Sequence, residues 1–329
     1  MLAVKKASSL TRNQTSPRKL SVNSATDLIL SENVQMSKFL VRLILELLAS
    51  LPLRVLQAIG RLLGRIIYML PGKYRERFRA NAAQAGYTDE AFLWRAAGES
   101  GAMFMELPRV WLRNEACLKL AHNVDESMMK DVMAENRGIL FLQPHLGGFE
   151  LAARHRAKTL DLTVMFRPPR KAFLLPIVEM VRNRSGIHTV PANLRGVRSF
   201  YRILKEKRAV GMLPDQVPSR GDGVWAPFFG KMAYTVSLPG KLAEASDAVV
   251  LVVGCKRLPK GKGWEMYMER VPEPLPQSDE ERAALINQIM ESMIRRFPEQ
   301  YMWGYNRFKV PKGVSALPEP LTVSTDKTV

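Results

Sequence analysis

From about residue 138 onward, the chain alternates short apolar runs with longer amphipathic segments. Apolar runs of about four to eight residues bounded by turn residues are typical of buried strands, and longer periodic segments are typical of helices. Strands that alternate with helices favour an α/β fold, layered α-β-α, with a mixed, partly parallel central sheet. The predicted strands are 138–143, 162–166, 209–213, 248–255 and 264–271, and the predicted helices are 174–184, 196–207, 237–245 and 280–297.

A different pattern precedes this region. Residues 1–36 are polar and basic without apolar periodicity, which predicts a mobile tail, and residues 314–329 have the same texture. Between residues 73 and about 135 the pattern is mainly helical, with predicted helices at 74–84, from about 88–90, and at 99–111. We therefore expect one main domain at 73–313, with a helical lead-in before the α/β core.

Residues 37–72 are the most apolar part of the chain. On a helical wheel, Arg54, Arg61 and Arg65 share one side of the segment 53–70, and aliphatic residues fill the other. This pattern fits a helix that lies in a lipid headgroup region with its arginines toward phosphates. It fits equally an ordinary helix that faces a protein core. Because residues 37–51 leave only a narrow polar edge, we favour membrane-associated helices at 37–72, and whether they cross a bilayer stays open.

The charge balance restricts the partners. The chain has 49 Lys and Arg against 31 Asp and Glu, a net charge of +18 that favours phosphates, carboxylates or an anionic membrane. No phosphate loop, zinc-ligand spacing or RNA-binding signature is present, so we expect no nucleic-acid partner and no metal. Two distant cysteines and the lack of a secretory signal at Met1 favour the reducing, cytosolic side.

One segment carries candidate residues for a catalytic site. Residues 138–150 read G-I-L-F-L-Q-P-H-L-G-G-F-E, which places His145 and Glu150 in a turn between a strand and a helix. Gly147 and Gly148 allow the backbone to approach a ligand, and an imidazole here can accept a proton while a carboxylate orients it. The alternative is a core histidine beside a solvated glutamate.

Two further polar positions follow predicted strands. Arg167 follows the strand at 162–166, and Asp215 follows the strand at 209–213. Sites in α/β folds gather where parallel strands end, so these residues are expected near His145. Each also has a simpler interpretation, Arg167 as a solvated charge and Asp215 as a turn residue.

The segment from about 51 to 311 resembles the late acyltransferases of lipid A biosynthesis, which share the glycerolipid acyltransferase fold. Its ordered motifs carry the resemblance: L-P-L-R, G-R-I-I-Y, the segment around His145, F-R-P-P, R-N-R-S-G, D-Q, P-F-F-G-K-M-A-Y-T, K-L-A and P-E-Q-Y-M-W-G-Y-N-R-F-K. The resemblance implies acyl transfer from an acyl carrier protein thioester to a hydroxyl on an acyl chain of a phosphorylated lipid A precursor. It also implies an inner-membrane enzyme whose catalytic domain at 73–313 lies on the cytoplasmic face, near anionic lipids.

The resemblance assigns His145 as general base and Glu150 as its orienting carboxylate. The expected contacts to substrate are Arg167 to phosphate or oxyanion, Arg182 and Arg184 to phosphate, Asp215 as a site-shaping acid, and the N–H groups of Gly147 and Gly148 as an oxyanion hole. No metal or other cofactor is expected, because the thioester is already activated. An acyl slot is expected at Phe228, Phe229 and Met232, whose alternative role is core packing.

Two other functions fit the same residues. A glycerol-phosphate or lysophospholipid acyltransferase shares the histidine and acid, although such enzymes usually carry a Pro-Glu-Gly segment where this chain has Pro214-Asp215-Gln216. A non-catalytic basic membrane-binding protein would account for the charge and the apolar helices alone. A measurement of acyltransferase activity separates an enzyme from a non-catalytic membrane-binding protein.

Overall fold

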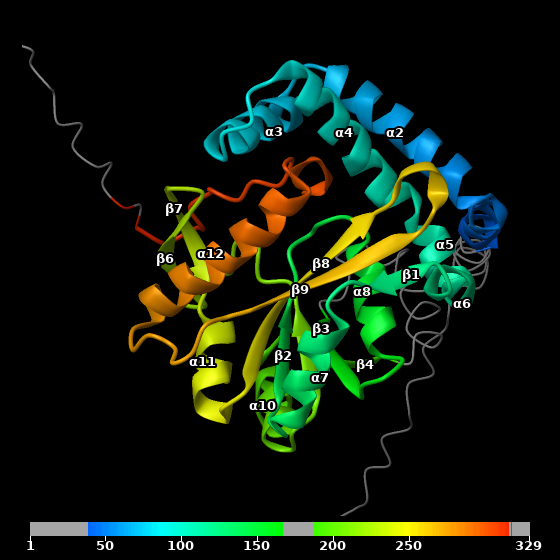
Figure 1. The fold of residues 1–329 in the computed structure, drawn as a ribbon. Helices are drawn as coiled ribbons and strands as arrows, with labels where there is room; N and C mark the ends of the chain where they lie inside the picture. Colours follow the sequence, from blue (N-terminus) through cyan, green and yellow to red (C-terminus); the bar gives the residue numbers. More distant parts are fainter. Residues whose placement is uncertain (1–38, 167–186, 316, 318–329) are drawn as a thin grey trace, which may run out of the picture.

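The computed structural model describes residues 39–166, 187–315 and 317, and a seven-stranded sheet lies at its centre (Figure 1). The strand order is β1-β9-β8-β2-β5-β3-β4; β8 and β9 are antiparallel, and every other neighbouring pair is parallel. The strands are β1 Ala121–Asn123, β2 Ile139–Leu142, β3 Leu162–Phe166, β4 His188–Pro191, β5 Ala209–Met212, β8 Val249–Arg257 and β9 Trp264–Arg270. A separate antiparallel hairpin is formed by β6 Gly223–Phe228 and β7 Lys231–Val236.

Helices cover both faces of the sheet. The alternation along β2 shows why: Leu140 and Leu142 pack into one buried cluster, and Ile139 and Phe141 into another on the opposite face. One cluster includes α5 Leu107–Leu112, α6 Asn114–Leu118, α7 Glu126–Ala134 and α8 Phe149–Arg156. The other includes α3 Lys73–Gln84, α4 Glu90–Met105, α10 Leu194–Lys205, α11 Leu238–Ser246 and α12 Asp279–Arg296. Two short 3-10 turns are also present, η2 Pro259–Gly261 and η3 Pro298–Gln300.

The largely parallel sheet confirms the predicted α/β class, and all five predicted strands are present within two residues at each end. The predicted helix at 174–184 lies outside the described residues. The predicted helix at 99–111 is wrong as one unit, because α4 ends at Met105 and α5 starts with Pro108 in its first turn. Proline lacks the N–H that a continuous helix requires. The sequence patterns missed β1, β4 and the β6–β7 hairpin, which are short or interrupted by glycine and proline.

The predicted helix at 53–70 is present as α2, Leu53–Met69, and residues 39–50 form another helix before it. Helix α2 packs closely on α4, because Gly60 and Gly64 meet the backbone around Gly101, where a Cβ atom would clash. Its other side is exposed and aliphatic. Within the described residues, no helix has both the length and the apolar character needed to cross a bilayer. The exposed aliphatic side chains of α2 are Val55, Ile59, Leu62, Leu63, Ile66 and Ile67.

The arginine stripe of α2 does not have the predicted orientation. Nε of Arg61 lies 2.6 Å from a carboxylate oxygen of Glu99 on α4, and the guanidinium of Arg65 stacks over Trp94, also on α4. Only Arg54 is fully exposed. The prediction that all three arginines point toward headgroup phosphates is therefore wrong for Arg61 and Arg65, because α4 offers them a carboxylate and an aromatic ring.

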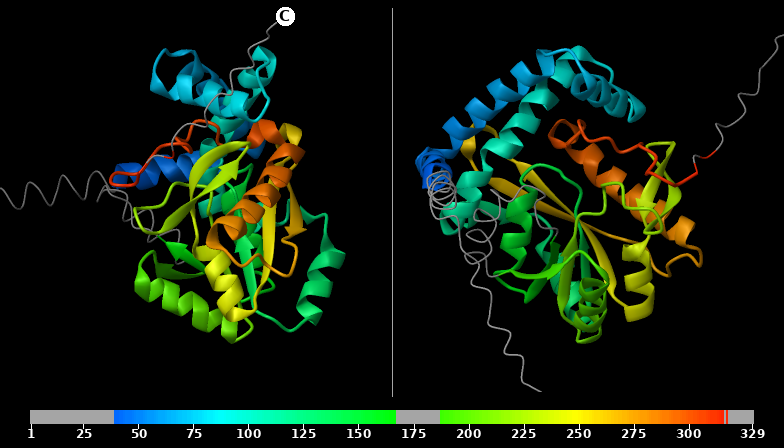
Figure 2. Two further views of the ribbon diagram at one scale, coloured as in Figure 1. Left: turned by 90° about the vertical axis from the view of Figure 1, so that its left-hand side faces the viewer. Right: turned by 180° about the vertical axis from the view of Figure 1, so that it is seen from behind.

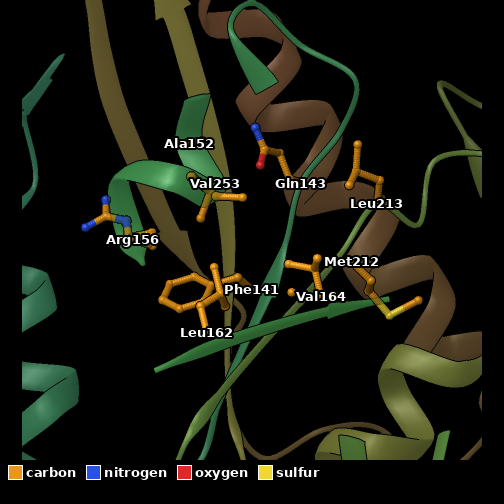
Figure 3. Close-up of a pocket in the computed structure, with 11 residues that line it drawn as sticks. Phe141, Gln143, Ala152, Arg156, Leu162, Val164, Met212, Leu213 and Val253 are labelled. Atoms are coloured by element: carbon orange, nitrogen blue, oxygen red, sulfur yellow. The ribbon is translucent and has the colours of Figure 1, made fainter. Parts of the chain in front are cut away.

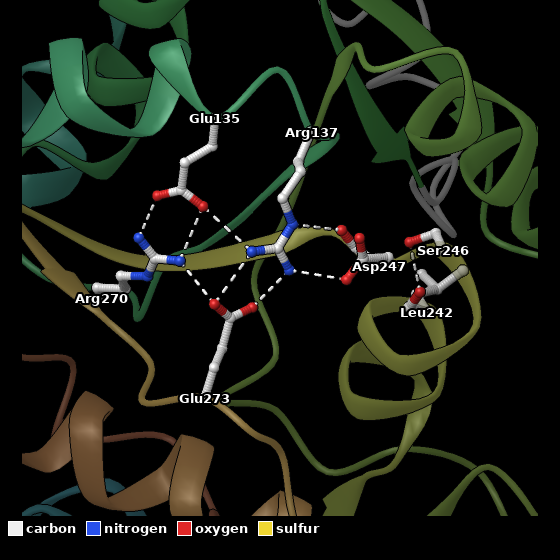
Figure 4. A network of polar contacts seen from close by, with 7 residues as sticks. All are labelled: Glu135, Arg137, Leu242, Ser246, Asp247, Arg270 and Glu273. Atoms are coloured by element: carbon white, nitrogen blue, oxygen red, sulfur yellow. Dashed lines mark hydrogen bonds and ion pairs between the residues drawn. The ribbon is translucent and has the colours of Figure 1, made fainter.

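An ion-pair network lies at the end of the sheet where β2 begins (Figure 4). Arg137 donates to Glu273 at 2.6 Å and to Asp247 at 3.0 Å, and Arg270 pairs with both Glu135 and Glu273. These contacts join the residues before β2 to the end of α11 and to β9. The network lies at the opposite end of β2 from His145, so it supports the sheet without taking part in the site.

Candidate functional site

The centre of the candidate site is a pair formed by His145 and Asp215. His145 follows β2 and Asp215 follows β5, which are parallel neighbours in register, so both residues lie beyond the same edge of the sheet. Nδ1 of His145 lies 2.7 Å from Oδ1 of Asp215, and the backbone N–H of His145 donates to Oδ2 at 2.8 Å. The Asp215 side chain is 1% exposed and that of His145 is 16% exposed. The carboxylate thus fixes the orientation of the imidazole ring through Nδ1, and Nε2 is the ring nitrogen that Asp215 does not contact.

The environment favours the protonated form of His145. Burial opposes the positive charge, but the charge of Asp215, its hydrogen bond and the charge of Glu150 outweigh burial and raise the pKa of His145 above its ordinary value. Burial likewise opposes the Asp215 carboxylate, and the charges of His145 and Arg307 hold its pKa below the ordinary value. The pair is therefore suited to accept a proton on Nε2 and to stabilise the imidazolium that forms.

Glu150 is near this pair without orienting the ring. In the described structure, the hydrogen-bond contacts of the His145 ring are with Asp215 and Gln216, and none is with Glu150. Trp111 donates its Nε1–H to Glu150 at 3.4 Å, and a guanidinium nitrogen of Arg154 lies 3.9 Å away. The sequence predicted that Glu150 orients the His145 ring. In the structure Asp215 has this position, because its carboxylate contacts Nδ1, whereas Glu150 acts on His145 only through its charge.

The two glycines of the turn serve the fold. Gly147 donates its N–H to the carbonyl of Gln300 at 3.0 Å, and Gly148 donates to the carbonyl of Cys255 at 2.8 Å. A Cβ atom on Gly147 would lie 1.8 Å from the Cys255 oxygen, and one on Gly148 would lie 2.5 Å from the Trp264 ring. The predicted oxyanion hole at these two N–H groups is therefore wrong, since both donors are already used to hold the turn against β8.

A buried ionic cluster around Arg257 contacts the turn that contains His145. The Arg257 side chain is completely buried, and it donates to Glu106 at 2.8 Å, to Glu99 at 2.7 Å and to the carbonyl of Gly147 at 3.3 Å. The side-chain amide of Gln300 accepts the backbone N–H of Arg257 at 2.7 Å and donates to the carbonyl of the same residue at 2.9 Å. These residues come from α4, β8 and η3, so the turn that contains His145 is held by segments far apart in the sequence. No motif in the chain indicated Arg257.

Three further residues complete the surroundings of the pair. Nε2 of Gln216 lies 3.4 Å from Nε2 of His145. Arg307 donates to the Tyr234 carbonyl at 2.9 Å and to the Thr235 hydroxyl at 2.7 Å, and its charge acts on Asp215. Burial and the nearby Asp215 carboxylate raise the pKa of Tyr301 well above its ordinary value. Gln216, Tyr301 and Arg307 fall in motifs that carried the family resemblance, and that was the only signal for them.

Three predicted contacts cannot be placed. Arg167, Arg182 and Arg184 lie outside the described residues, so their expected contacts to phosphate remain predictions. Asp215 was expected to shape the site, and the structure places it in direct contact with the base.

A cavity of about 500 Å³ opens beside Gln216. It extends between the start of α10, the loop after β5 and the start of α11, and Leu194, Val197 and Leu238 are among the apolar side chains that line it. Its size falls within the range of roughly 300–1,000 Å³ that is usual for ligand pockets. This cavity touches a neighbour of His145 and has the capacity for an acyl chain.

Two smaller cavities do not have that capacity. A cavity of about 30 Å³ lies between α8 and the sheet, lined by Phe141, Leu162, Val253 and the stem of Arg156 (Figure 3). The volume equals roughly that of one water molecule. Phe228 and Phe229 are buried beside a space of about 10 Å³, and Met232 is exposed. The acyl slot predicted at these three residues is therefore wrong, because the rings of Phe228 and Phe229 belong to the core and Met232 lies on the surface.

This arrangement can activate a hydroxyl group. Nε2 of a neutral His145 accepts the proton, Asp215 stabilises the resulting imidazolium, and the Gln216 amide supplies a donor on the same side. The adjacent cavity has room for a long apolar group. A base, an orienting carboxylate and an apolar cavity together are suited to acyl transfer to an alcohol.

Comparison with known proteins agrees with this chemistry. The chain is 30% identical over 196 residues to the lipid A biosynthesis palmitoleoyltransferase of Escherichia coli, a match that covers 57% of this chain and 62% of that enzyme. It is 30% identical over 192 residues to the lipid A biosynthesis lauroyltransferase of the same organism, covering 56% and 61%. An acyltransferase of lipid A biosynthesis from Haemophilus influenzae is 26% identical over 180 residues, covering 53% and 55%.

The matched region thus spans about three fifths of the length of the first two relatives. The family model of the bacterial lipid A biosynthesis acyltransferases matches far more of this chain, from residue 28 to residue 310, and includes every residue of the site described above. The chain belongs to the bacterial lipid A biosynthesis acyltransferase family.

Proposed function

We propose that this protein transfers an acyl group from an acyl carrier protein thioester to a hydroxyl on an acyl chain of a phosphorylated lipid A precursor. The observation that carries the proposal is the 2.7 Å contact between Nδ1 of His145 and Asp215, which leaves Nε2 for the substrate hydroxyl. The family match supports a late acylation in lipid A biosynthesis. The named relatives act in the same process.

The reaction proceeds by proton transfer through His145. Nε2 takes the hydroxyl proton as the oxygen attacks the thioester carbonyl, and a C–O bond forms in a tetrahedral intermediate. The intermediate collapses with cleavage of the C–S bond, and the imidazolium returns the proton to the departing sulfur. Asp215 stabilises the imidazolium between these two steps, and Glu150 adds a second negative charge nearby. The thioester is already activated, so we propose that no metal or cofactor takes part.

The Gln216 amide is the proposed donor to the developing oxyanion. Its Nε2 lies 3.4 Å from Nε2 of His145, the nitrogen that takes the hydroxyl proton in this proposal. The cavity beside Gln216 takes the acyl chain against its apolar side chains, which include Leu194, Val197 and Leu238. In this proposal Gln216 takes the oxyanion-donor role predicted for Gly147 and Gly148, because the N–H groups of those glycines already have acceptors.

We place the enzyme at the inner membrane with its catalytic domain on the cytoplasmic face. The support is the exposed aliphatic side of α2 together with Phe39, Leu40, Leu43 and Leu47 on the preceding helix. Patches of this kind in soluble proteins mark contacts with membranes or partners. A lipid acceptor lies in the membrane that this patch would contact. The positive charge of the chain suits anionic lipids and acceptor phosphates.

The other two functions have less support. The family match extends over most of the chain and favours a lipid A precursor over glycerol phosphate or a lysophospholipid as acceptor. A purely membrane-binding role gives no reason to pair a partly exposed histidine with an almost fully buried aspartate.

Mass spectrometry of the acceptor provides the test. Purified protein is incubated with acyl carrier thioesters of differing chain length and a phosphorylated lipid A precursor, and the acceptor is expected to gain the mass of one acyl group. His145→Ala should lower the transfer rate by at least about a hundredfold, as expected for loss of a general base. Transfer by the variant at the wild-type rate, or acylation of lysophospholipid in preference to the precursor, would refute the proposal.

A further inference from the structure

Helix α10 presents a cationic face beside the cavity. Arg195, Arg198, Arg202 and Lys205 are all exposed, and their spacing of three, four and three residues places them on one side of the helix. The opposite side is buried in the core through Phe200, Ile203 and Leu204. The helix is therefore amphipathic, with a fixed orientation and four cations that point away from the sheet.

Most of this charge is not neutralised by the residues that the structure describes. Over residues 39–166, 187–315 and 317, the side chains of Arg195 and Arg198 have no hydrogen-bonding or ionic partner. Arg202 has only a loose contact of 3.9 Å with Glu206. By contrast, the surface arginines Arg137 and Arg270 each pair with carboxylates. Exposed, unpaired cations in a row produce a local positive potential that attracts an acidic partner.

The position of α10 connects this potential to the site. Asn193, Leu194 and Val197, at the start of the helix, line the cavity that reaches Gln216 beside His145. The cationic face begins at Arg195, next to these lining residues. Leu194 is 65% exposed at the same place and offers an apolar contact. A partner bound on α10 is thus close enough to insert a flexible arm into the cavity.

The fold separates this face from the apolar helices. Helix α10 lies at the bottom of the view in Figure 1 and α2 crosses the top, and both views of Figure 2 keep this separation. If the exposed aliphatic side of α2 contacts the membrane, α10 is at the end remote from the bilayer. A protein partner in solution can reach it there, whereas lipid headgroups reach α2 first.

We infer that Arg195, Arg198, Arg202 and Lys205 form the docking surface for the acidic carrier protein that delivers the thioester, an inference that rests on the proposed function. Acidic side chains of the carrier pair with these cations, and its acyl-bearing arm enters the cavity past Leu194 toward Gln216. Exposed ionic contacts of this type control the association rate and its dependence on salt. The surface therefore affects the use of the carrier-bound donor and leaves the chemistry at His145 unchanged.

The test uses Arg195→Glu combined with Arg198→Glu and two donors with the same acyl group. With the acyl carrier protein thioester, KM should rise by about tenfold or more, and its dependence on salt should weaken. With acyl-pantetheine, a small uncharged thioester, kcat/KM should stay within about twofold of wild type. Lys119→Glu combined with Lys130→Glu is the matched control, because it makes the same charge change on exposed lysines of another face.

Direct binding separates this inference from the proposed function. Fluorescence anisotropy of a labelled carrier protein should show about tenfold weaker binding to the α10 variant than to wild type or to the control. If wild type transfers from neither donor, the proposed function fails while the binding comparison still tests the docking surface. Unchanged carrier binding, an equal loss with both donors, or weaker retention on anionic vesicles with unchanged carrier binding would each overturn the inference, the last by indicating a membrane contact.

Discussion

Asp215 holds His145 at two points: one carboxylate oxygen accepts the backbone N–H at 2.8 Å, and the other lies 2.7 Å from ring Nδ1. The double contact fixes both the turn and the ring. A carboxylate with this geometry determines which ring nitrogen carries the proton in the neutral state and leaves Nε2 as the base.

Asp215→Asn should lower kcat by at least about a hundredfold, because the amide neither fixes the productive tautomer nor stabilises the imidazolium. It should also change the pH dependence. The base acts when neutral, so activity rises as pH passes through the pKa of His145, which Asp215 raises. Loss of the carboxylate lowers that pKa, so the acidic limb of kcat/KM against pH should move to lower pH.

Glu150→Gln is the matched comparison for this profile. Glu150 raises the pKa of His145 through its charge alone, and its effect ranks below that of Asp215. Its variant should move the acidic limb in the same direction by a smaller amount. A larger displacement in Glu150→Gln than in Asp215→Asn, with both variants folded by circular dichroism, would restore Glu150 as the orienting acid.

Gln216→Ala should lower kcat by about a hundredfold, the loss typical of one oxyanion donor. The acidic limb of the pH profile should stay in place, because the amide carries no charge. Single-turnover kinetics with the carrier thioester measure the effect on chemistry directly. Ser219→Ala, in the same loop and lining the same cavity, should retain activity and serves as control. Full activity of the Gln216 variant would exclude the amide as donor.

Leu62→Glu combined with Ile66→Glu should abolish retention on anionic vesicles with little effect on the midpoint of thermal unfolding, because both side chains are exposed on α2. Val124→Glu with Met133→Glu adds the same charge at other exposed apolar positions and should keep retention. Flotation assays measure the difference. Equal retention of all three proteins would remove the membrane role of α2.

Leu56→Ala probes the other side of the same helix. Leu56 is completely buried, so its truncation should lower the free energy of unfolding by about 2–5 kcal/mol without weakening vesicle retention of the folded protein. Chemical denaturation measures the loss. Arg61→Gln should act in the same way to a smaller extent, since Arg61 pairs with Glu99 in the protein.

Arg257→Ala should lower the free energy of unfolding by about 3–5 kcal/mol, because it leaves Glu106 buried without its cation. Arg257→Met combined with Glu106→Gln should recover part of this loss by removing the uncompensated charge. Urea unfolding of the two variants provides the measurement. A single-variant loss below about 1 kcal/mol would show that the cluster does not hold the turn against β8.

The sequence determined the α/β class, the five main strands and the location of the turn that contains His145. These features are local: apolar runs such as 139–142 need burial on both faces, and the motif around His145 lies within one strand–turn–helix unit. The family resemblance rested on the same local motifs. Such features depend on near neighbours in the chain, so a pattern of residues is enough to predict them.

Only the tertiary structure decided which acid reaches His145. Glu150 is five residues away in sequence, but its carboxylate contacts Trp111 of α5 and lies beside Arg154 one turn further along α8. Asp215 is 70 residues away and lies in hydrogen-bonding contact, because β2 and β5 are parallel neighbours that end at the same edge. The same holds for the arginines of α2, whose wheel position was clear from the sequence while their direction depended on Glu99 and Trp94 of α4. Contacts between distant segments follow from strand pairing and helix packing, which a single sequence does not encode as a local pattern.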